Sequence, residues 1–179
     1  MEKLTHSHGV SVQWHSYELR PAGAPPISEA YKQKILAGRP RFEATAKAQY
    51  GLTINPGPFG IDTSRSHIGG KFAEAQGVGP AYHEAVMTAY WRDARNIADD
   101  AVLIDIAETV GLNRDAFMAA LDDQTYANEH REDVQKAFQY GLNGVPASVL
   151  NNKYLVSGAQ PYDVFVNVVE QVQERERNG

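Results

Sequence analysis

The sequence of 179 residues contains no cysteine. Without a thiol, the chain can form no disulfide, offers no thiolate to a metal ion and has no cysteine nucleophile. It also has no uninterrupted apolar run of about 18 residues, the length that a membrane-spanning helix needs, and no signal-peptide stretch near its first residue. These absences predict a cytoplasmic protein that does not span a membrane.

An excess of positive charge is missing as well. The chain has 17 Lys and Arg against 22 Asp and Glu, which gives a net charge of −5. Nucleic-acid-binding proteins carry basic surfaces that neutralise phosphates, so we predict no nucleic-acid partner. The composition present, 42% hydrophobic and 22% charged residues, is typical of a folded domain that buries a core without disulfides.

Short strands are predicted near both ends of the chain. Residues 10–19 alternate in character, with Val12 and Trp14 on one face, and a period of two in β-branched and aromatic residues is typical of a strand. Residues 146–150 and 154–156 predict two further strands around a tight turn.

Helices are predicted for most of the chain between these strands, because apolar residues recur there at spacings of three and four. Ser28 is a predicted N-cap. Helices over 29–37 and 41–50 are expected to be separate, because Gly38-Arg39-Pro40 lies between them and proline cannot donate the helical hydrogen bond. A strand, a helical block, two strands and a last helix indicate an α/β or α+β chain.

Few residues suggest chemistry. His6 and His8 lie close to the first residue, where such a pair is more often exposed to solvent than bound to metal, so no metal site is predicted. Ser148 and Ser157 lack the Gly-x-Ser-x-Gly pattern of a hydrolase nucleophile. His67, on a helix predicted to be buried, is expected to be a hydrogen-bonded core or interface residue. We predict no catalytic residue and no cofactor.

The segment Gly144-Val145-Pro146 lies where a loop enters a predicted strand. A bond before proline is cis in only about 5 to 6% of cases, so the ordinary expectation is a trans proline that limits a sheet edge. A cis bond would instead expose the backbone of Val145 for pairing with an extended peptide. From the residues alone, both possibilities stay open for Gly144, Val145 and Pro146.

The carboxyl third also resembles a known family. Two segments are similar to the DsbA-like thioredoxin family and its cytoplasmic FrnE-like branch: Gly144-Val145-Pro146-Ala147-Ser148-Val149-Leu150 and Val156-Ser157-Gly158-Ala159-Gln160-Pro161. Supporting similarities lie in Trp14–Leu19, Ser66-His67 and Asn96–Asp99. The resemblance implies an α/β, thioredoxin-like fold interrupted by an inserted helical domain. It assigns residues 1–26 and 141–179 to the thioredoxin-like domain and 27–140 to the insertion.

The resemblance further implies thiol-disulfide exchange through a Cys-x-x-Cys motif at the start of the first helix. It makes a cis bond at Val145–Pro146 the expectation, because this loop docks a disulfide protein or peptide substrate in the family. The resemblance thus makes Gly144, Val145 and Pro146 the candidate substrate-binding residues. The first strand, the Cys-x-x-Cys motif and most of the first helix would precede Val10, yet only Met1 to His8 stand there. We therefore expect an incomplete thioredoxin-like domain that is redox-inactive as given.

Two explanations of this departure stay open. Either the chain is a truncated form of a longer protein, or a second copy, in a homodimer, or another segment takes the place of the missing strand. Two other functions also stay open. One is a relationship to the glutathione-dependent kappa-class transferases and 2-hydroxychromene-2-carboxylate isomerases, and the other is a non-catalytic peptide-binding module at Val145.

Overall fold

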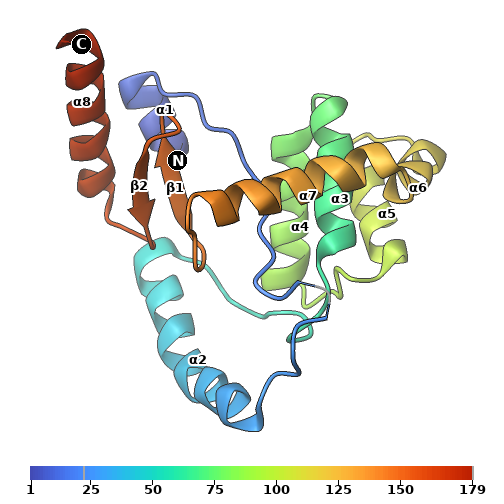
Figure 1. The fold of residues 1–179 in the computed structure, drawn as a ribbon. Coiled ribbons are helices and arrows are strands. Elements are labelled where there is room, and N and C mark those ends of the chain that lie inside the picture. The colour runs from blue at the N-terminus through green and yellow to red at the C-terminus, as the bar shows by residue number, and fades with distance from the viewer. Residues whose placement is uncertain (22, 179) are drawn as a thin grey trace. The chain divides into compact units, whose positions relative to one another are not determined.

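The computed structural model describes residues 1–21 and 23–178 (Figure 1). The chain divides into two compact units. Unit 1 comprises Met1–Leu19 and Asp133–Gly179, and unit 2 comprises Arg20–Glu132. Among the described residues, no helix is long and apolar enough to cross a membrane.

Unit 1 contains the β-hairpin that the sequence predicts. Strands β1 (Ala147–Leu150) and β2 (Tyr154–Ser157) pair antiparallel, with Ala147 opposite Ser157 and Leu150 opposite Tyr154. Asn151 and Asn152 both have positive φ, at 49° and 54°. Asparagine tolerates this conformation better than most residues, so the turn chemistry agrees with the strand pattern and the hairpin prediction is confirmed.

Two helices of unit 1 pack against each other. They are α1 (Glu2–His8) and α8 (Tyr162–Asn178), and buried side chains on them include Leu4, Val169 and Val172. A hydrogen bond of 2.7 Å joins the hydroxyl groups of Ser7 and Tyr162. The side-chain amide of Gln173 donates to the carbonyl of His8 at 3.3 Å.

The predicted strand over residues 10–19 is wrong, because the structure has no strand there. Val12 and Trp14 are 39% and 49% exposed, so the face expected to be covered is open to solvent. The alternation of side chains was present, but a strand forms only where another strand accepts its backbone bonds. A side chain of α7 (Gln124–Gln139) holds the segment instead, since the amide of Ser16 donates to Asp133 Oδ2 at 2.8 Å.

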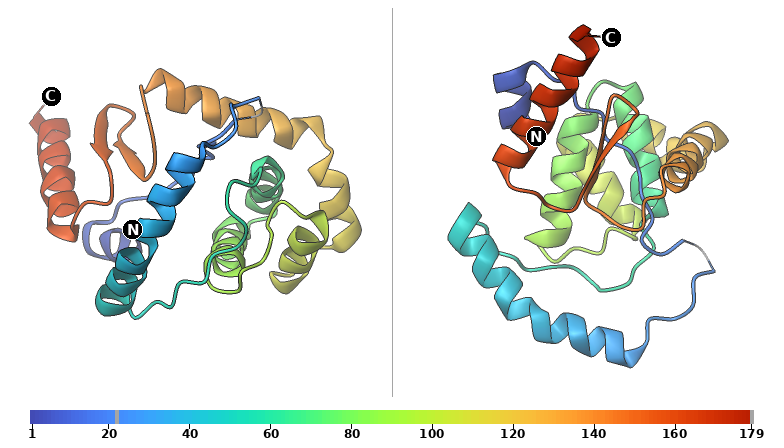
Figure 2. Two further views of the ribbon diagram at one scale, coloured as in Figure 1. Left: turned by 90° about the horizontal axis from the view of Figure 1, so that it is seen from below. Right: turned by 60° about the vertical axis from the view of Figure 1, so that its left-hand side comes forward.

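Unit 2 begins with α2 (Glu29–Tyr50), where the sequence predicts two separate helices. That prediction is wrong, since the helix continues through Pro40 (Figure 2). Proline removes one helical hydrogen bond, to the carbonyl of Leu36, and this part of the helix is exposed, so water can replace the lost partner. Ser28 caps the helix as predicted, accepting from the amide of Tyr31.

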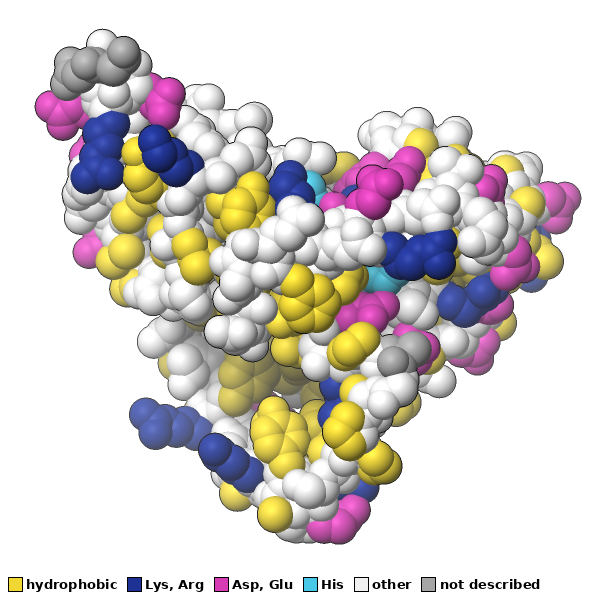
Figure 3. Space-filling view, viewed as in Figure 1, with side chains coloured by type: hydrophobic (Ala, Val, Ile, Leu, Met, Phe, Trp, Pro, Cys, Tyr) yellow, Lys and Arg dark blue, Asp and Glu magenta, His cyan; other side chains and the backbone are white. Residues whose placement is uncertain are grey.

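Most hydrophobic side chains of α2 are exposed rather than buried. Figure 3 shows them gathered on the helix among lysine and arginine side chains. Tyr31, Leu36 and Phe42 are each more than half exposed, and Phe42 lies 5.9 Å from Trp91 between ring centroids. Among the described residues of α2, Ala46 is the buried one.

The core of unit 2 lies among four helices: α3 (Ser64–Ala75), α4 (Gly79–Trp91), α5 (Asp100–Thr109) and α6 (Arg114–Leu121). Phe117 is fully buried and lies 5.6 to 6.0 Å from the rings of Tyr82 and Phe72. The buried members of this core are Phe72, Ala73, Tyr82, Val86, Ala89, Ile97, Leu103, Ile104, Ile106, Ala107, Leu112, Phe117, Ala120 and Leu121.

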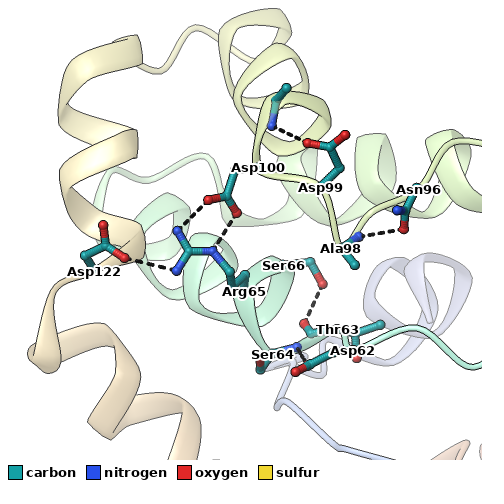
Figure 4. A network of polar contacts seen from close by, with 11 residues as sticks. Asp62, Thr63, Ser64, Arg65, Ser66, Asn96, Ala98, Asp99, Asp100 and Asp122 are labelled. Atoms are coloured by element: carbon teal, nitrogen blue, oxygen red, sulfur yellow. Dashed lines mark hydrogen bonds and ion pairs between the residues drawn. The ribbon is translucent and has the colours of Figure 1, made fainter.

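A polar network ties three of these helices together at their ends (Figure 4). Arg65 on α3 donates to both carboxylate oxygens of Asp100, at 2.5 and 2.7 Å, and to Asp122 at 3.0 Å. Asp99 caps α5 by accepting from the amide of Ala101. The Arg65 side chain is about one third exposed, so the network orients the helices more than it stabilises them.

Candidate functional site

The candidate site begins where α7 ends in unit 1. Gly141 has a φ of 67°, and its amide donates to the carbonyl of Phe138, while the amide of Leu142 donates to that of Ala137. This left-handed glycine satisfies the last carbonyls of the helix and turns the chain away. The chain then runs through residues 142–146 into β1.

The structure brings the three predicted residues together. Gly144, Val145 and Pro146 line one pocket of about 360 Å³ in unit 1, and the Val145–Pro146 peptide bond is cis. The complete lining is Gly141, Leu142, Asn143, Gly144, Val145, Pro146, Leu155, Ser157 and Gly158. No member of this lining carries a charge, so the pocket favours uncharged groups.

The pairing of β1 with β2 shows which backbone groups of the loop are open. The amide of Gly158 donates to the carbonyl of Pro146 at 2.8 Å, which makes these two residues a hydrogen-bonded pair of the ladder. Such pairs alternate along antiparallel strands, so the backbone groups of Ala147 and Val149 point away from β2. We call this row the open edge of β1.

The open edge has no neighbour in the described part of the chain. The sheet contains only β1 and β2 there, and the backbone of Val145 makes no hydrogen bond with any described residue. Pro146, which has no amide hydrogen, directs its carbonyl toward β2 and therefore does not interrupt the open edge. Such an edge can accept an extended chain as a further strand.

Three lining residues on β2 and the turn after it were missed by the sequence prediction. Leu155, Ser157 and Gly158 lie opposite residues 146 to 149 because of the hairpin register. Leu155 and Val145 are each 49% exposed, so they offer apolar surface beside the open edge. The signal was available, since a predicted turn over 151–153 already fixes this register.

The histidines do not gather into a metal site. His8 lies 3.7 Å from Glu170 through its Nε2 atom, while His67 stacks on His130 in unit 2, with ring centroids 5.3 Å apart. Among the described residues, no group of three or more potential ligands is placed to hold a metal ion. The chemistry of the candidate site is therefore that of backbone amides, carbonyls and apolar side chains.

Comparison with protein families gives a match along most of the chain. The model described as "DSBA-like thioredoxin domain" matches residues 1–170. The uncharacterized protein YwbO of Bacillus subtilis is 27% identical over 180 residues, which cover 97% of this chain and 88% of that protein. The thiol:disulfide interchange protein DsbA of Azotobacter vinelandii is 29% identical over 108 residues, which cover 59% of this chain and 50% of that protein.

Solved structures give the same fold. A probable DsbA oxidoreductase from Streptomyces coelicolor has a TM-score of 0.69 and 29% identity, covering 96% of this chain and 65% of that one. A 2-hydroxychromene-2-carboxylate isomerase has a TM-score of 0.79 and 18% identity, covering 99% and 88%. The chain thus spans less than two thirds of the Streptomyces protein and half of the DsbA protein. These likenesses show a thioredoxin-like α/β fold with a helical insertion, the class predicted from the sequence.

Proposed function

The chain belongs to the family of DsbA-like thioredoxin domains, and we propose that it binds extended polypeptide at the loop of Gly144, Val145 and Pro146 without catalysing disulfide exchange. The observation that carries this proposal is the open edge of β1, which lies beside an uncharged pocket. A peptide added there would form backbone hydrogen bonds with Val145, Ala147 and Val149. The pocket would take uncharged side chains of the peptide.

The absence of exchange follows from the chemistry of the chain. Disulfide exchange begins when a thiolate attacks a disulfide sulfur, and this chain has no cysteine to supply one. Among the side chains that line the candidate site, the hydroxyl of Ser157 is the group that could best act as a nucleophile. The lining contains no basic side chain that could activate this hydroxyl. We therefore propose a binding role for these residues rather than a catalytic one.

Several finer expectations stay predictions. They are the FrnE-like branch of the family, the cytoplasmic location, the domain bounds 1–26 with 141–179 and 27–140, and a homodimer. The proposal on polypeptide binding depends on none of them. It concerns the backbone row of β1 and the adjoining pocket.

Binding can be tested with a probe that is permanently unfolded and has no free thiol, such as fluorescein-labelled, reduced and carboxymethylated ribonuclease. We expect a saturable rise in its fluorescence anisotropy. Val149→Pro removes one outward amide and should weaken binding by up to about tenfold, whereas Val149→Thr keeps the amide and should bind like the parent. Equal binding by all three proteins would contradict the proposal.

Catalysis can be tested separately by turbidity in an insulin-reduction assay with dithiothreitol. We expect the rate with dithiothreitol alone, because the chain has no thiol to shuttle. Accelerated precipitation would refute a purely binding role. Retention of the chain on immobilised glutathione, without binding of the unfolded probe, would favour the isomerase alternative.

A further inference from the structure

The helix α2 of unit 2 stands apart from the hydrophobic core of that unit. It has 22 residues, and Ala46 is its one buried residue among those that the structure describes. No other described helix or strand packs extensively against it. In proteins, most of the stability of a helix comes from the packing of an apolar face. An exposed helix that carries large apolar side chains is therefore a candidate contact surface.

Three large apolar side chains of α2 lie on one face. Tyr31, Ile35 and Phe42 are spaced by four and by seven residues, which at 3.6 residues per turn places them in one row. They are 52%, 40% and 51% exposed, and Figure 3 shows apolar side chains of this helix open to solvent. The ring of Phe42 lies against that of Trp91 on one side. We call Tyr31, Ile35 and Phe42 the apolar stripe.

Basic residues border the apolar stripe on both sides. Lys34 and Arg41 each precede a residue of the stripe by one position, so both lie about 100° around the helix from it, on the same flank. Both are exposed, and neither forms an ion pair with a described residue. On the other flank, Lys32 and Arg39 pair with glutamates at 2.6 Å. The charges of the first flank are therefore available to an anionic partner.

The charge of α2 is opposite to that of the whole chain. The helix has five basic residues and two acidic ones, which gives +3, whereas the chain carries −5. Both acidic residues, Glu29 and Glu43, take part in the two ion pairs. Lys34, Arg41 and Lys47 therefore keep uncompensated charges within the described structure. A partner that matches this helix combines negative charge with an apolar layer.

We propose that α2 binds the surface of an anionic lipid bilayer. The apolar stripe enters the boundary between headgroups and acyl chains, while the lysine and arginine side chains extend along it to the lipid phosphates. Tyr31 fits this depth, because its ring is apolar and its hydroxyl reaches the polar layer. Cations stand on both flanks and at Lys47, so a surface with phosphates on every side of the helix matches them better than a groove with one acidic wall.

The chain as a whole gives the opposite expectation. A net charge of −5 and the lack of a spanning helix among the described residues predict no membrane partner. The net charge averages over the chain, however, and at an ionic strength of 0.1 M charges more than about 10 Å away are largely screened. A helix that lies in the plane of the surface also needs no spanning length. The inference does not rest on polypeptide binding, which concerns unit 1.

Cosedimentation with vesicles tests the binding directly. The whole chain is mixed with vesicles of phosphatidylcholine alone or of phosphatidylcholine with an equal part of phosphatidylglycerol, and the bound fraction is measured against lipid concentration. We expect saturable binding to the anionic vesicles that weakens as salt is added, and little binding to the neutral vesicles. No binding to the anionic vesicles, or equal binding to both kinds, would overturn the proposal.

Two double variants with the same net charge locate the binding surface. Lys34→Gln with Arg41→Gln removes two positive charges from α2 and should weaken binding to the anionic vesicles by about ten- to thirtyfold. Lys136→Gln with Lys153→Gln removes two positive charges from α7 and the hairpin turn and should bind like the parent. Equal losses in the two double variants would show that overall charge governs the binding, and the assignment to α2 would be wrong.

A change in the apolar stripe tests its insertion into the bilayer. Ile35→Gln should weaken binding by up to about tenfold, whereas Met118→Gln on α6, where the side chain is 45% exposed against 40% for Ile35, should have no effect. Urea titrations confirm that each variant is folded. Unchanged binding by Ile35→Gln would refute insertion. Self-association that Ile35→Gln abolishes in sedimentation velocity, without any binding to vesicles, would assign α2 to a second copy of the chain instead.

Discussion

The two units differ in how they use their apolar residues. Unit 2 buries fourteen hydrophobic residues in one continuous core among α3 to α6. Unit 1 buries few by comparison in its described residues, and it leaves apolar side chains exposed at Val12, Trp14, Val145 and Leu155. Burial of apolar surface is the main favourable term in folding. We infer that unit 2 supplies most of the stability through this core, although its helix α2 leaves apolar side chains exposed as unit 1 does.

The largest test of this comparison is a cavity in the core of unit 2. Phe117→Ala removes a fully buried ring that packs on Phe72 and Tyr82, and such changes cost about 3 to 5 kcal/mol. The free energy of unfolding from urea titrations measures the loss. The matched control is Phe138→Ala on α7, where the ring is 62% exposed, and it should change stability by less than about 0.5 kcal/mol. Similar losses in both variants would contradict the assignment of the core.

The next effect concerns the contacts of Asp133 with His15 and Ser16 in unit 1. Asp133→Ala leaves the amide of the buried Ser16 and the ring of His15 without their carboxylate, at a cost of about 1 to 3 kcal/mol. Glu132→Ala changes the exposed neighbour on α7 and should have almost no effect. Hydrogen exchange should become faster at Ser16 in Asp133→Ala alone. Unchanged exchange there would mean that Asp133 does not hold the segment.

The same contrast explains what the sequence could and could not predict. The hairpin of β1 and β2 was predictable because its signals are local: alternating apolar residues on each side of Asn151 and Asn152. The strand expected at residues 10–19 carried the same alternation, but strand formation depends on a partner that no local pattern specifies. The break expected at Pro40 failed for the related reason that solvent can replace one lost helical bond.

For the candidate site, the loop residues stand out in the sequence by themselves, whereas the residues opposite them can be found only through the hairpin register. Gly144, Val145 and Pro146 stand out as a loop entering a strand, whereas Leu155 and Ser157 are ordinary strand residues. They join the pocket through the register of the hairpin. The open edge could not be predicted either, because it exists only if no other described strand pairs with that side of β1, and the local sequence does not specify this.

A smaller effect distinguishes two adjacent glycines on α3. A Cβ atom at Gly69 would lie 2.6 Å from Tyr82 Oη and 2.7 Å from Phe117 Cζ, whereas at Gly70 the nearest atom is 3.9 Å away. Gly69→Ala should therefore destabilise by about 1 to 2 kcal/mol through overpacking. Gly70→Ala should stabilise by roughly 0.5 to 1 kcal/mol, because alanine favours a helix. Urea titrations with the same sign for both variants would show that α3 packs less tightly than the structure indicates.

The smallest effect lies at a buried hydroxyl in the same core. Tyr82 is 2% exposed, and no described residue accepts a hydrogen bond from its hydroxyl, so Tyr82→Phe should stabilise the protein by about 1 kcal/mol at neutral pH. Burial raises the pKa of Tyr82 above its ordinary value of 10.0. The contribution of the buried neutral phenol to the free energy of unfolding is therefore fully present below pH 10 and is lost as the pH rises further. Urea titrations at pH 8 and pH 11 should show a larger advantage for Tyr82→Phe at the higher pH, and an equal or smaller one would contradict the burial of this hydroxyl.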